Sequence, residues 1–182
     1  MVVDCKPLAD ILSGRAVLTD VALRPVFVRH ARFIAKMCQD GRRPRVDFAP
    51  YVEWRPGRFN PVADFLCKFV MDRQASAEDI NTAEVLSAVA HRLNLHLCSD
   101  GGLRPGSCGA TGWILYSVKP CGEQLLWSRL AWRTMFLDVS IAHSSIQREA
   151  VALEDGVNFL ASFYSKSSAV FSVEVVVFGF RF

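Results

Sequence analysis

The feature that most constrains this chain is an aspartate placed directly after an apolar strand. Residues 93–98 alternate with period two, and the segment Cys98-Ser99-Asp100-Gly101-Gly102 follows. The two glycines let the backbone turn, and residues 109–116 then lead into a second strand. A carboxylate beside a buried strand loses solvation unless a cation meets it. The pattern therefore indicates a divalent metal as the partner of Asp100.

Length and composition favour a globular protein. The chain has 182 residues, of which 51% are hydrophobic and 21% charged, as expected for one domain or one domain with an appendage. No apolar run reaches the roughly 18 residues that cross a bilayer, and the N-terminus lacks the pattern of a secretory signal. We therefore expect an intracellular protein, cytoplasmic or nuclear, that is neither secreted nor bound to a membrane.

Cysteine spacing and charge distribution limit the kinds of function that the sequence favours. The 6 cysteines are scattered without metal-ligand spacing to one another or to the 4 histidines, which argues against a zinc site. Residues 1–75 carry a net charge of +5 and residues 76–182 a net charge of −2. This asymmetry suits a polyanion-binding surface beside a carboxylate cluster, although it also lies within ordinary scatter.

In the first half, the spacing predicts a short helix within residues 1–20, a helix over 26–40 and a strand over 48–54. The loop at 41–45 is basic, and its arginines together with one beyond the strand are candidates for phosphate contacts: Arg42, Arg43, Arg45 and Arg58. A solvated connection explains the same loop equally simply.

A helix beginning at Pro61 is predicted next, with Asn60 as its cap and Asp64 in its first turn. The helix dipole alone accounts for Asp64, and the alternative is a metal-facing carboxylate. Residues 72–80 are polar and read as a linker. A short helix over 82–92 follows, with Val85, Leu86 and Val89 on its docked face.

In the second half, antiparallel strands are predicted at 93–98, 112–118 and 124–133, with Leu126 and Trp132 pointing inward on the last. Ser144 and Gln147 have capping-box spacing and start a helix whose buried stripe runs from Ile146 to Leu160. Glu149 flanks that stripe as a dipole residue, an ion-pair residue or a metal ligand. Residues 173–178 have the composition of a buried strand.

This order of elements resembles the first half of a ribonuclease H domain of the reverse transcriptase or retroelement type. The resemblance covers residues 93–180 and rests on Asp100-Gly101-Gly102, on the following strands and on the helix containing Arg148-Glu149-Ala150. It implies a mixed α/β sheet in which three antiparallel strands are followed by a helix and a parallel strand. It also implies that Asp100 and Glu149 are catalytic carboxylates.

The first half carries a second resemblance, over residues 51–70, to the last strand and helix of a ribonuclease H-like or connection domain. Asn60 and Ala63-Asp64 match the segment that supplies a fourth carboxylate. We favour an origin in which residues 1–75 are the end of a connection domain, followed by a linker and short helix at 76–92 and a domain at 93–182. The pieces can also pack as a permuted fold, and the two interpretations are not exclusive. In the permuted fold, Asp64, Asp100 and Glu149 converge.

The resemblance implies a nuclease that binds Mg²⁺ or Mn²⁺ and cleaves the RNA strand of RNA–DNA hybrids, within a larger reverse transcriptase polyprotein. The family's third aspartate is expected after the strand at 173–178, where the chain has Gly179 and Phe180 instead. The alternatives are therefore a catalytically dead nucleic-acid-binding or interaction module, and a truncated retrotransposon remnant.

Overall fold

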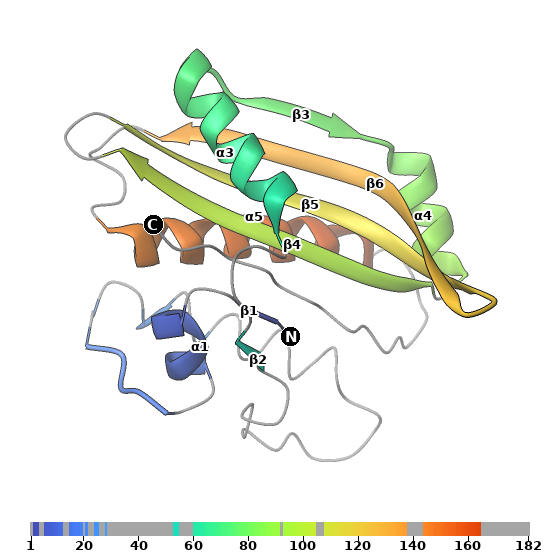
Figure 1. The fold of residues 1–182 in the computed structure, drawn as a ribbon, viewed down its shortest axis with the longest axis horizontal. Coiled ribbons are helices and arrows are strands. Elements are labelled where there is room, and N and C mark those ends of the chain that lie inside the picture. The colour runs from blue at the N-terminus through green and yellow to red at the C-terminus, as the bar shows by residue number, and fades with distance from the viewer. Residues whose placement is uncertain are drawn as a thin grey trace.

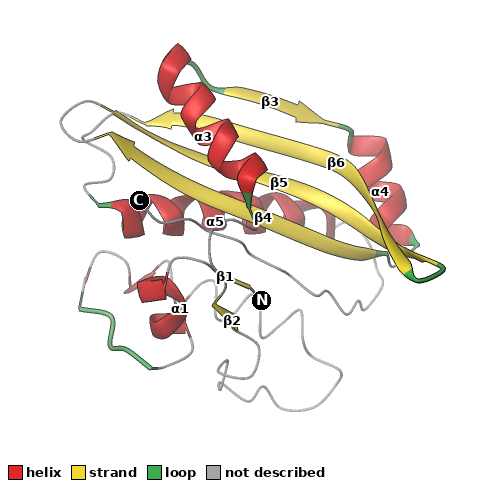
Figure 2. Cartoon of the chain, viewed as in Figure 1, coloured by secondary structure: helices red, strands yellow, loops and turns green. Residues whose placement is uncertain are grey.

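The computed structural model describes residues 2–3, 6–12, 15–19, 21, 24–25, 28, 53–54, 60–91, 93–104, 108–137 and 144–164. Its centre is a four-stranded antiparallel sheet with the strand order β3-β6-β5-β4. The strands are β3 (Ala77–Ile80), β4 (Asn94–Arg104), β5 (Cys108–Cys121) and β6 (Gln124–Leu137). Helices lie on both faces of this sheet (Figures 1 and 2). The mixed α/β class is confirmed, and the ribonuclease H-like fold stays a prediction.

Four helices have bounds within the described residues: α1 (Lys6–Leu12), α3 (Pro61–Arg73), α4 (Thr82–Ala90) and α5 (Ser145–Tyr164). The helices α3 and α5 cross opposite faces of the sheet (Figure 1). Two short strands, β1 (Val2–Val3) and β2 (Glu53–Trp54), pair in parallel as a separate sheet. The predicted helix at 26–40, most of the strand at 48–54 and the strand at 173–178 lie outside the described residues.

The main core lies between the sheet and α5. Leu95 and Leu97 of β4 pack with the buried stripe of α5, which includes Leu153, Val157 and Leu160. The alternation of β4 and the stripe of α5 are therefore confirmed. Ala9 of α1 is fully buried in the same cluster, so a segment from the first part of the chain shares a core with the second part.

The ends of two helices follow the expected chemistry. Ser144 and Gln147 form the predicted capping box, because the Ser144 hydroxyl accepts from the Gln147 amide and the Gln147 side chain accepts from the Ser144 amide. The Asn81 side chain caps α4 by accepting from the amide of Glu84 at 3.2 Å. Within α4, Val85 and Val89 are buried as predicted, whereas Leu86 is 44% exposed and that part of the prediction is wrong.

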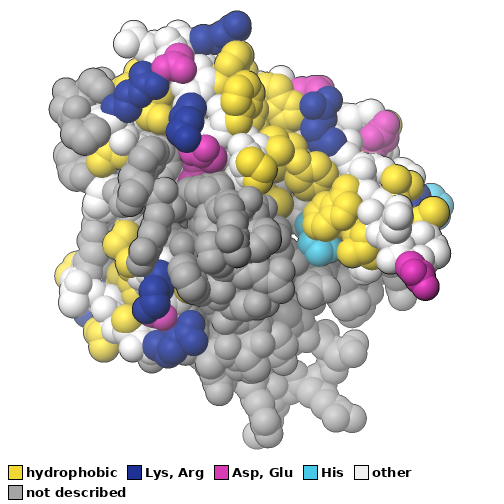
Figure 3. Space-filling model, in the orientation of Figure 1, with side chains coloured by type: hydrophobic (Ala, Val, Ile, Leu, Met, Phe, Trp, Pro, Cys, Tyr) yellow, Lys and Arg dark blue, Asp and Glu magenta, His cyan; other side chains and the backbone are white. Residues whose placement is uncertain are grey.

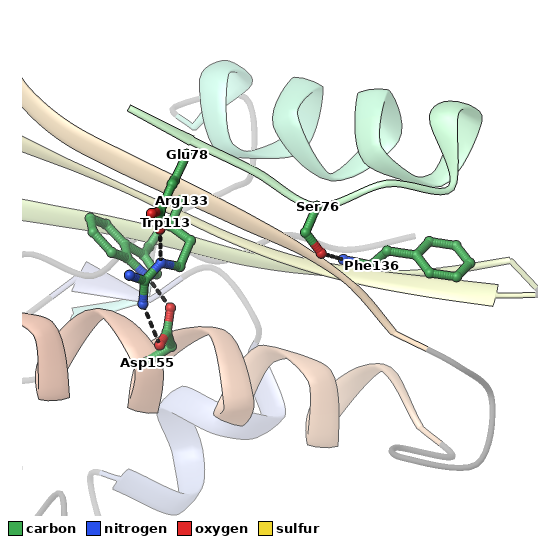
Figure 4. Close-up of polar contacts among 6 residues, drawn as sticks. All are labelled: Ser76, Glu78, Trp113, Arg133, Phe136 and Asp155. Atoms are coloured by element: carbon green, nitrogen blue, oxygen red, sulfur yellow. Dashed lines mark hydrogen bonds and ion pairs between the residues drawn. The ribbon is translucent and has the colours of Figure 1, made fainter. Parts of the chain in front are cut away.

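The polar stretch 72–80 is not a linker. It contains β3, which pairs with β6 at the outer edge of the sheet. Charged pairs support this polar strand, since the Arg133 Nε lies 2.6 Å from a Glu78 carboxylate oxygen and an Arg133 Nη1 lies 3.3 Å from Asp155 of α5. The Trp113 indole also donates to Asp155 at 2.5 Å (Figure 4). These contacts hold an edge strand that has little apolar surface to bury.

The hairpin strands are longer than predicted. Strand β4 continues through both glycines to Arg104, and β5 begins at Cys108, so the predicted glycine loop is mostly strand. At the other hairpin, Leu126 is 56% exposed and was wrongly predicted to point inward. Leu125 and Trp127 are also exposed, at 60% and 44%. Figure 3 shows hydrophobic side chains at the surface on the face viewed there.

Candidate functional site

Asp100 lies within β4 rather than after it. It pairs with Gly112 of β5, which in turn pairs with Thr134 of β6, and its side chain is 1% exposed. Because side chains alternate along a strand, Asp100 shares a face with Gly102. A Cβ added at Gly102 would meet Met71 and Cys67, so this is the face that α3 covers. The expectation that the strand ends before Asp100 is therefore wrong, whereas the burial of its charge is confirmed.

The two glycines after Asp100 make room for helices and do not form a turn. A Cβ at Gly101 would overlap the backbone of α5 at Arg148 and Glu149. A Cβ at Gly102 would lie 2.9 Å from the methyl carbon of Met71 on α3. The absence of side chains on successive residues thus lets α5 approach one face of β4 and α3 the other. This close approach fixes where Glu149 lies.

This contact places the backbone of Glu149 beside the residue that follows Asp100. The Glu149 backbone nitrogen touches Gly101, the next residue along the chain from Asp100, and the Glu149 side chain is 1% exposed. Both carboxylates also act on the same atom, since each of them raises the pKa of the Cys67 thiol. Two of the three predicted carboxylates are therefore buried within one small region.

Cys67 of α3 lies between the helix and this part of the sheet. Its Sγ donates to the backbone oxygen of Asp100 at 3.4 Å, and a Cβ at Gly112 would be 3.3 Å from the same Sγ. Burial is the largest cause of the strongly raised pKa of this thiol, followed by the negative charges of Asp100 and Glu149. The thiol is therefore neutral and acts as a hydrogen-bond donor.

The beginning of α3 is anchored to the same strand. Asn60 does not cap α3 with its side chain as predicted, and its Nδ2 instead donates to the Ser99 oxygen at 3.1 Å. Asp64 lies one helical turn further on the same side of the helix. Its carboxylate pairs with Lys68 at 2.7 Å and keeps 25% exposure. Asp64 is thus a partly exposed residue of α3 with an ion pair of its own.

A buried arginine stands beside the candidate pair. Arg148 is 0% exposed, and its Nη1 donates to the Gly102 oxygen at 3.3 Å. Its guanidinium fills the space above Gly109, where a Cβ would overlap it. Burial lowers the pKa of Arg148. The guanidinium ties the start of α5 to the end of the β4–β5 hairpin and places a cation next to Glu149 in the chain.

The predicted phosphate-binding residues Arg42, Arg43, Arg45 and Arg58 lie outside the described residues. Within the described part, basic side chains of α3 and β4 include Lys68, Arg73 and Arg104, and Arg104 pairs with Asp72. The Arg73 guanidinium carbon lies 4.2 Å from the centre of the Phe69 ring. Figure 3 shows Lys and Arg side chains at the surface on this face.

The fit to a metal ion is partial. Asp100 and Glu149 supply the oxygen donors that Mg²⁺ and Mn²⁺ prefer, and Mg²⁺ is commonly held by one or two carboxylates together with water and substrate phosphates. The described part of the chain holds no group of three or more His, Cys, Asp or Glu side chains arranged to bind a metal. The described residues thus offer two carboxylates to an ion, and both of these side chains are buried at 1% exposure.

Sequence reasoning found Asp100 and Glu149 but missed Cys67, Arg148 and the role of Asn60. A buried cysteine is ordinarily a small hydrophobe, so nothing in the spacing of Cys67 marks it as a donor. Arg148 directly precedes Glu149. Because opposite charges at the start of a helix are common, this position did not mark Arg148 as part of the site. The Asn-x-x-Ala-Asp segment was the available signal for Asn60, although it did not reveal the contact to Ser99.

No protein-family model, curated protein or solved structure matches this chain. None of the helices in the described ranges is both long enough and apolar enough to cross a membrane.

Proposed function

We propose that this chain is a ribonuclease H-like domain that binds RNA–DNA hybrids and hydrolyses the RNA strand with Mg²⁺ or Mn²⁺. The observation that carries the proposal is that the backbone of α5 at Glu149 packs against Gly101, the residue after Asp100 on β4, and that both carboxylates are buried. Two carboxylates from distant parts of the sequence are both buried, and a divalent cation would offset the cost of burying their negative charges. The elements that carry these carboxylates follow the order strand, hairpin and helix. The resemblance to ribonuclease H rests on the same order.

In the proposed reaction, water attacks the phosphorus of an RNA phosphodiester bond and the bond to the 3′ oxygen breaks. A divalent cation, when bound, would supply an attacking water of lowered pKa and would offset the charge on the departing oxygen. Asp100 and Glu149 would hold the cation. The chain recognises a hybrid by groove shape, phosphates and 2′-hydroxyl groups rather than by base sequence. Arg42, Arg43, Arg45 and Arg58 are the proposed backbone contacts.

The packing of both halves into one body supports the permuted arrangement for the proposed domain. Helix α3 of the first half covers the sheet of the second half, and Ala9 of α1 shares the core of α5. In a permuted domain, α3 supplies Asp64 as a further carboxylate from the face opposite α5. The Asn60 contact to Ser99 holds the beginning of α3 close to Asp100.

A permuted domain also offers a candidate for the third aspartate. In the sequence, Asp4 directly follows β1, and β1 pairs in parallel with β2. The family's third aspartate follows a strand that is parallel to its neighbours. Asp4 itself lies outside the described residues, so it enters the proposal through its place in the sequence alone.

Cleavage of an end-labelled RNA–DNA hybrid by the full chain, with Mg²⁺, Mn²⁺ or EDTA, tests this function. Asp100→Asn and Glu149→Gln are expected to lose more activity than the roughly 10- to 100-fold that loss of an outer-shell partner costs. Asp79→Asn serves as the matched control, because Asp79 is a surface carboxylate that is 59% exposed and pairs with Arg129. Equal cleavage by all variants would contradict the proposal.

A second candidate is a catalytically dead module that binds hybrids. The sequence motivates it, because Gly179 and Phe180 stand where the resemblance expects the third aspartate. This module would retard a hybrid in a gel shift and leave it intact in both Mg²⁺ and Mn²⁺. Asp4→Asn also separates the two candidates, because this substitution can reduce cleavage only if the wild-type chain cleaves the hybrid.

A further inference from the structure

We propose that Cys67 and Asn60 of α3 are positioning residues for the Asp100 carboxylate. The inference rests on the proposed function, because it assigns these residues to the same metal site. The two side chains donate to consecutive backbone oxygens of β4, with Asn60 Nδ2 3.1 Å from the Ser99 oxygen and Cys67 Sγ 3.4 Å from the Asp100 oxygen. We call this pair of contacts the α3 clamp.

The clamp acts at the place where β4 has least support from its own side chains. Gly101 and Gly102 follow Asp100, and Gly112 lies opposite it. Glycine leaves the backbone more freedom than any other residue, so this part of the hairpin needs external contacts to hold one conformation. The clamp supplies two such contacts, one to the backbone oxygen of Ser99 and one to that of Asp100.

A neighbouring contact fixes α3 to the sheet in the correct register. The Thr134 hydroxyl lies 3.0 Å from the Thr111 oxygen and 3.5 Å from the Leu66 oxygen of α3, and it is buried. Leu66 precedes Cys67, so this contact limits sliding of the helix along the sheet. Buried polar contacts of this kind are costly to break, and they specify geometry more than they add stability.

The clamp also explains why a cysteine occupies position 67. A Cβ at Gly112 would lie 3.3 Å from Cys67 Sγ, and Met71 and Gly102 fill the neighbouring space. A larger side chain would overlap the sheet, whereas alanine would remove the donor. A thiol is small, apolar and still able to donate weakly to an oxygen. The residue thus combines packing with orientation of the strand.

The protein offers a matched control in Cys98. It is buried, lies two residues before Asp100 on the same face of β4, and is a free thiol like Cys67. Its removal creates a cavity of the same size in the same layer. The difference is that Cys67 donates to the Asp100 oxygen. A role in positioning and a role in packing alone therefore predict different results for the two substitutions.

The experiment is a Mn²⁺ titration of the full chain by calorimetry, with thermal melting and hybrid cleavage measured on the same samples. For Cys67→Ala and Asn60→Ala, Mn²⁺ affinity is expected to fall about 10- to 100-fold, as it does when an outer-shell partner is lost. Cys67→Ser restores a donor and is expected to recover the affinity. Cys98→Ala is expected to lower the melting temperature as much as Cys67→Ala while leaving Mn²⁺ affinity unchanged.

The outcomes separate this inference from the proposed function. If the wild-type chain binds Mn²⁺ and the Cys67→Ala and Cys98→Ala variants bind it equally well, the clamp is overturned and the metal site stands. If the wild-type chain binds no Mn²⁺ and cleaves no hybrid, the proposed function fails and the clamp fails with it. If Cys67→Ala does not fold, Asn60→Ala against Cys98→Ala gives the same comparison, because Asn60 supplies the other donor of the clamp.

Discussion

The two faces of the central sheet use the same strands for different purposes. On the face covered by α5, Leu95, Leu97, Trp113 and Leu115 form an apolar core with the helix. On the face covered by α3, the packed side chains are smaller, and the buried groups include Cys67, Asp100 and Thr134. The alternation of side chains along a strand separates the two environments by one residue. One face thus supplies most of the stability, and the other holds the candidate chemistry.

Glu149 is the exception that joins the faces. It comes from α5, on the apolar side, and reaches the region of Asp100 because Gly101 leaves space for the helix backbone. The comparison teaches that the stable face does more than support the sheet. The helix on this face, α5, also carries Glu149, and the position of Glu149 depends on the absence of a side chain at Gly101.

The largest expected effect is on the apolar face. Leu97 is fully buried there, so Leu97→Ala should lower the free energy of unfolding by about 2–5 kcal/mol. The exposed Leu126 provides the control, because Leu126→Ala should change stability by less than about 0.5 kcal/mol. Urea unfolding followed by tryptophan fluorescence measures both. Equal losses would show that the apolar face does not carry the stability.

The next effect concerns the contact that joins the faces. Gly101→Ala should push α5 away from β4, because its Cβ would overlap the backbone of Arg148 and Glu149. Overpacking of this kind costs about 1–3 kcal/mol, and Mn²⁺ affinity should fall together with stability. Gly122→Asn is the control, since Gly122 has a φ of 61° and open space around it. A Gly101→Ala protein with normal Mn²⁺ affinity would break the proposed link between the faces.

A comparable loss is expected from the polar network that attaches β3. Asp155→Asn keeps the shape of the side chain but removes the charge that faces Arg133 and the acceptor that Trp113 uses. The expected cost is about 1–3 kcal/mol in urea unfolding. Glu84→Gln, at an exposed position of α4, should have a much smaller effect. Cleavage by the Asp155→Asn protein should stay normal below its melting range, because the network lies on the α5 face of the sheet, opposite the face of the Asp100 side chain.

The smallest effect over its measured range, pH 9 to pH 10, concerns the buried thiols. Burial raises the pKa of Cys98 from 9.0 to about 12, so the folded state keeps a proton that the unfolded state loses. The stability contributed by this thiol is therefore complete below about pH 9 and declines as the pH rises towards 12. The decline should be about 1.4 kcal/mol per pH unit for each such thiol in this window. Cys98→Ala should show a shallower decline between pH 9 and pH 10 in urea unfolding, and an unchanged slope would contradict the assignment.

Much of the second half of the molecule was predictable from the sequence. Period-two alternation gave β4, the capping-box spacing of Ser144 and Gln147 gave the start of α5, and the apolar stripe gave its buried face. These signals are local, so each of them is readable without the rest of the fold. The polar strand β3 was missed because its stability comes from distant charges, such as those of Arg133, rather than from its own composition.

The candidate site was predictable only in its carboxylates. Asp100 and Glu149 stand at positions that a resemblance can point to, whereas the role of Gly101 depends on a helix that arrives 48 residues later in the chain. The same holds for Cys67, whose partner at Asp100 is 33 residues away. Gly101 and Gly102 were predicted to form a turn, but in the structure they allow the close approach of two helices. Which of these roles a glycine takes depends on the packing against both faces of the strand.

The most direct test of the central claim is a double-mutant cycle on Mn²⁺ binding. Wild type, Asp100→Asn, Glu149→Gln and the double variant are titrated with Mn²⁺ by calorimetry. If the two carboxylates hold one ion, each single change should remove most of the affinity and the double change should add little, which is the signature of coupled residues. Additive small losses, or Mn²⁺ affinity equal to wild type in both single variants, would contradict the claim that Asp100 and Glu149 form one site.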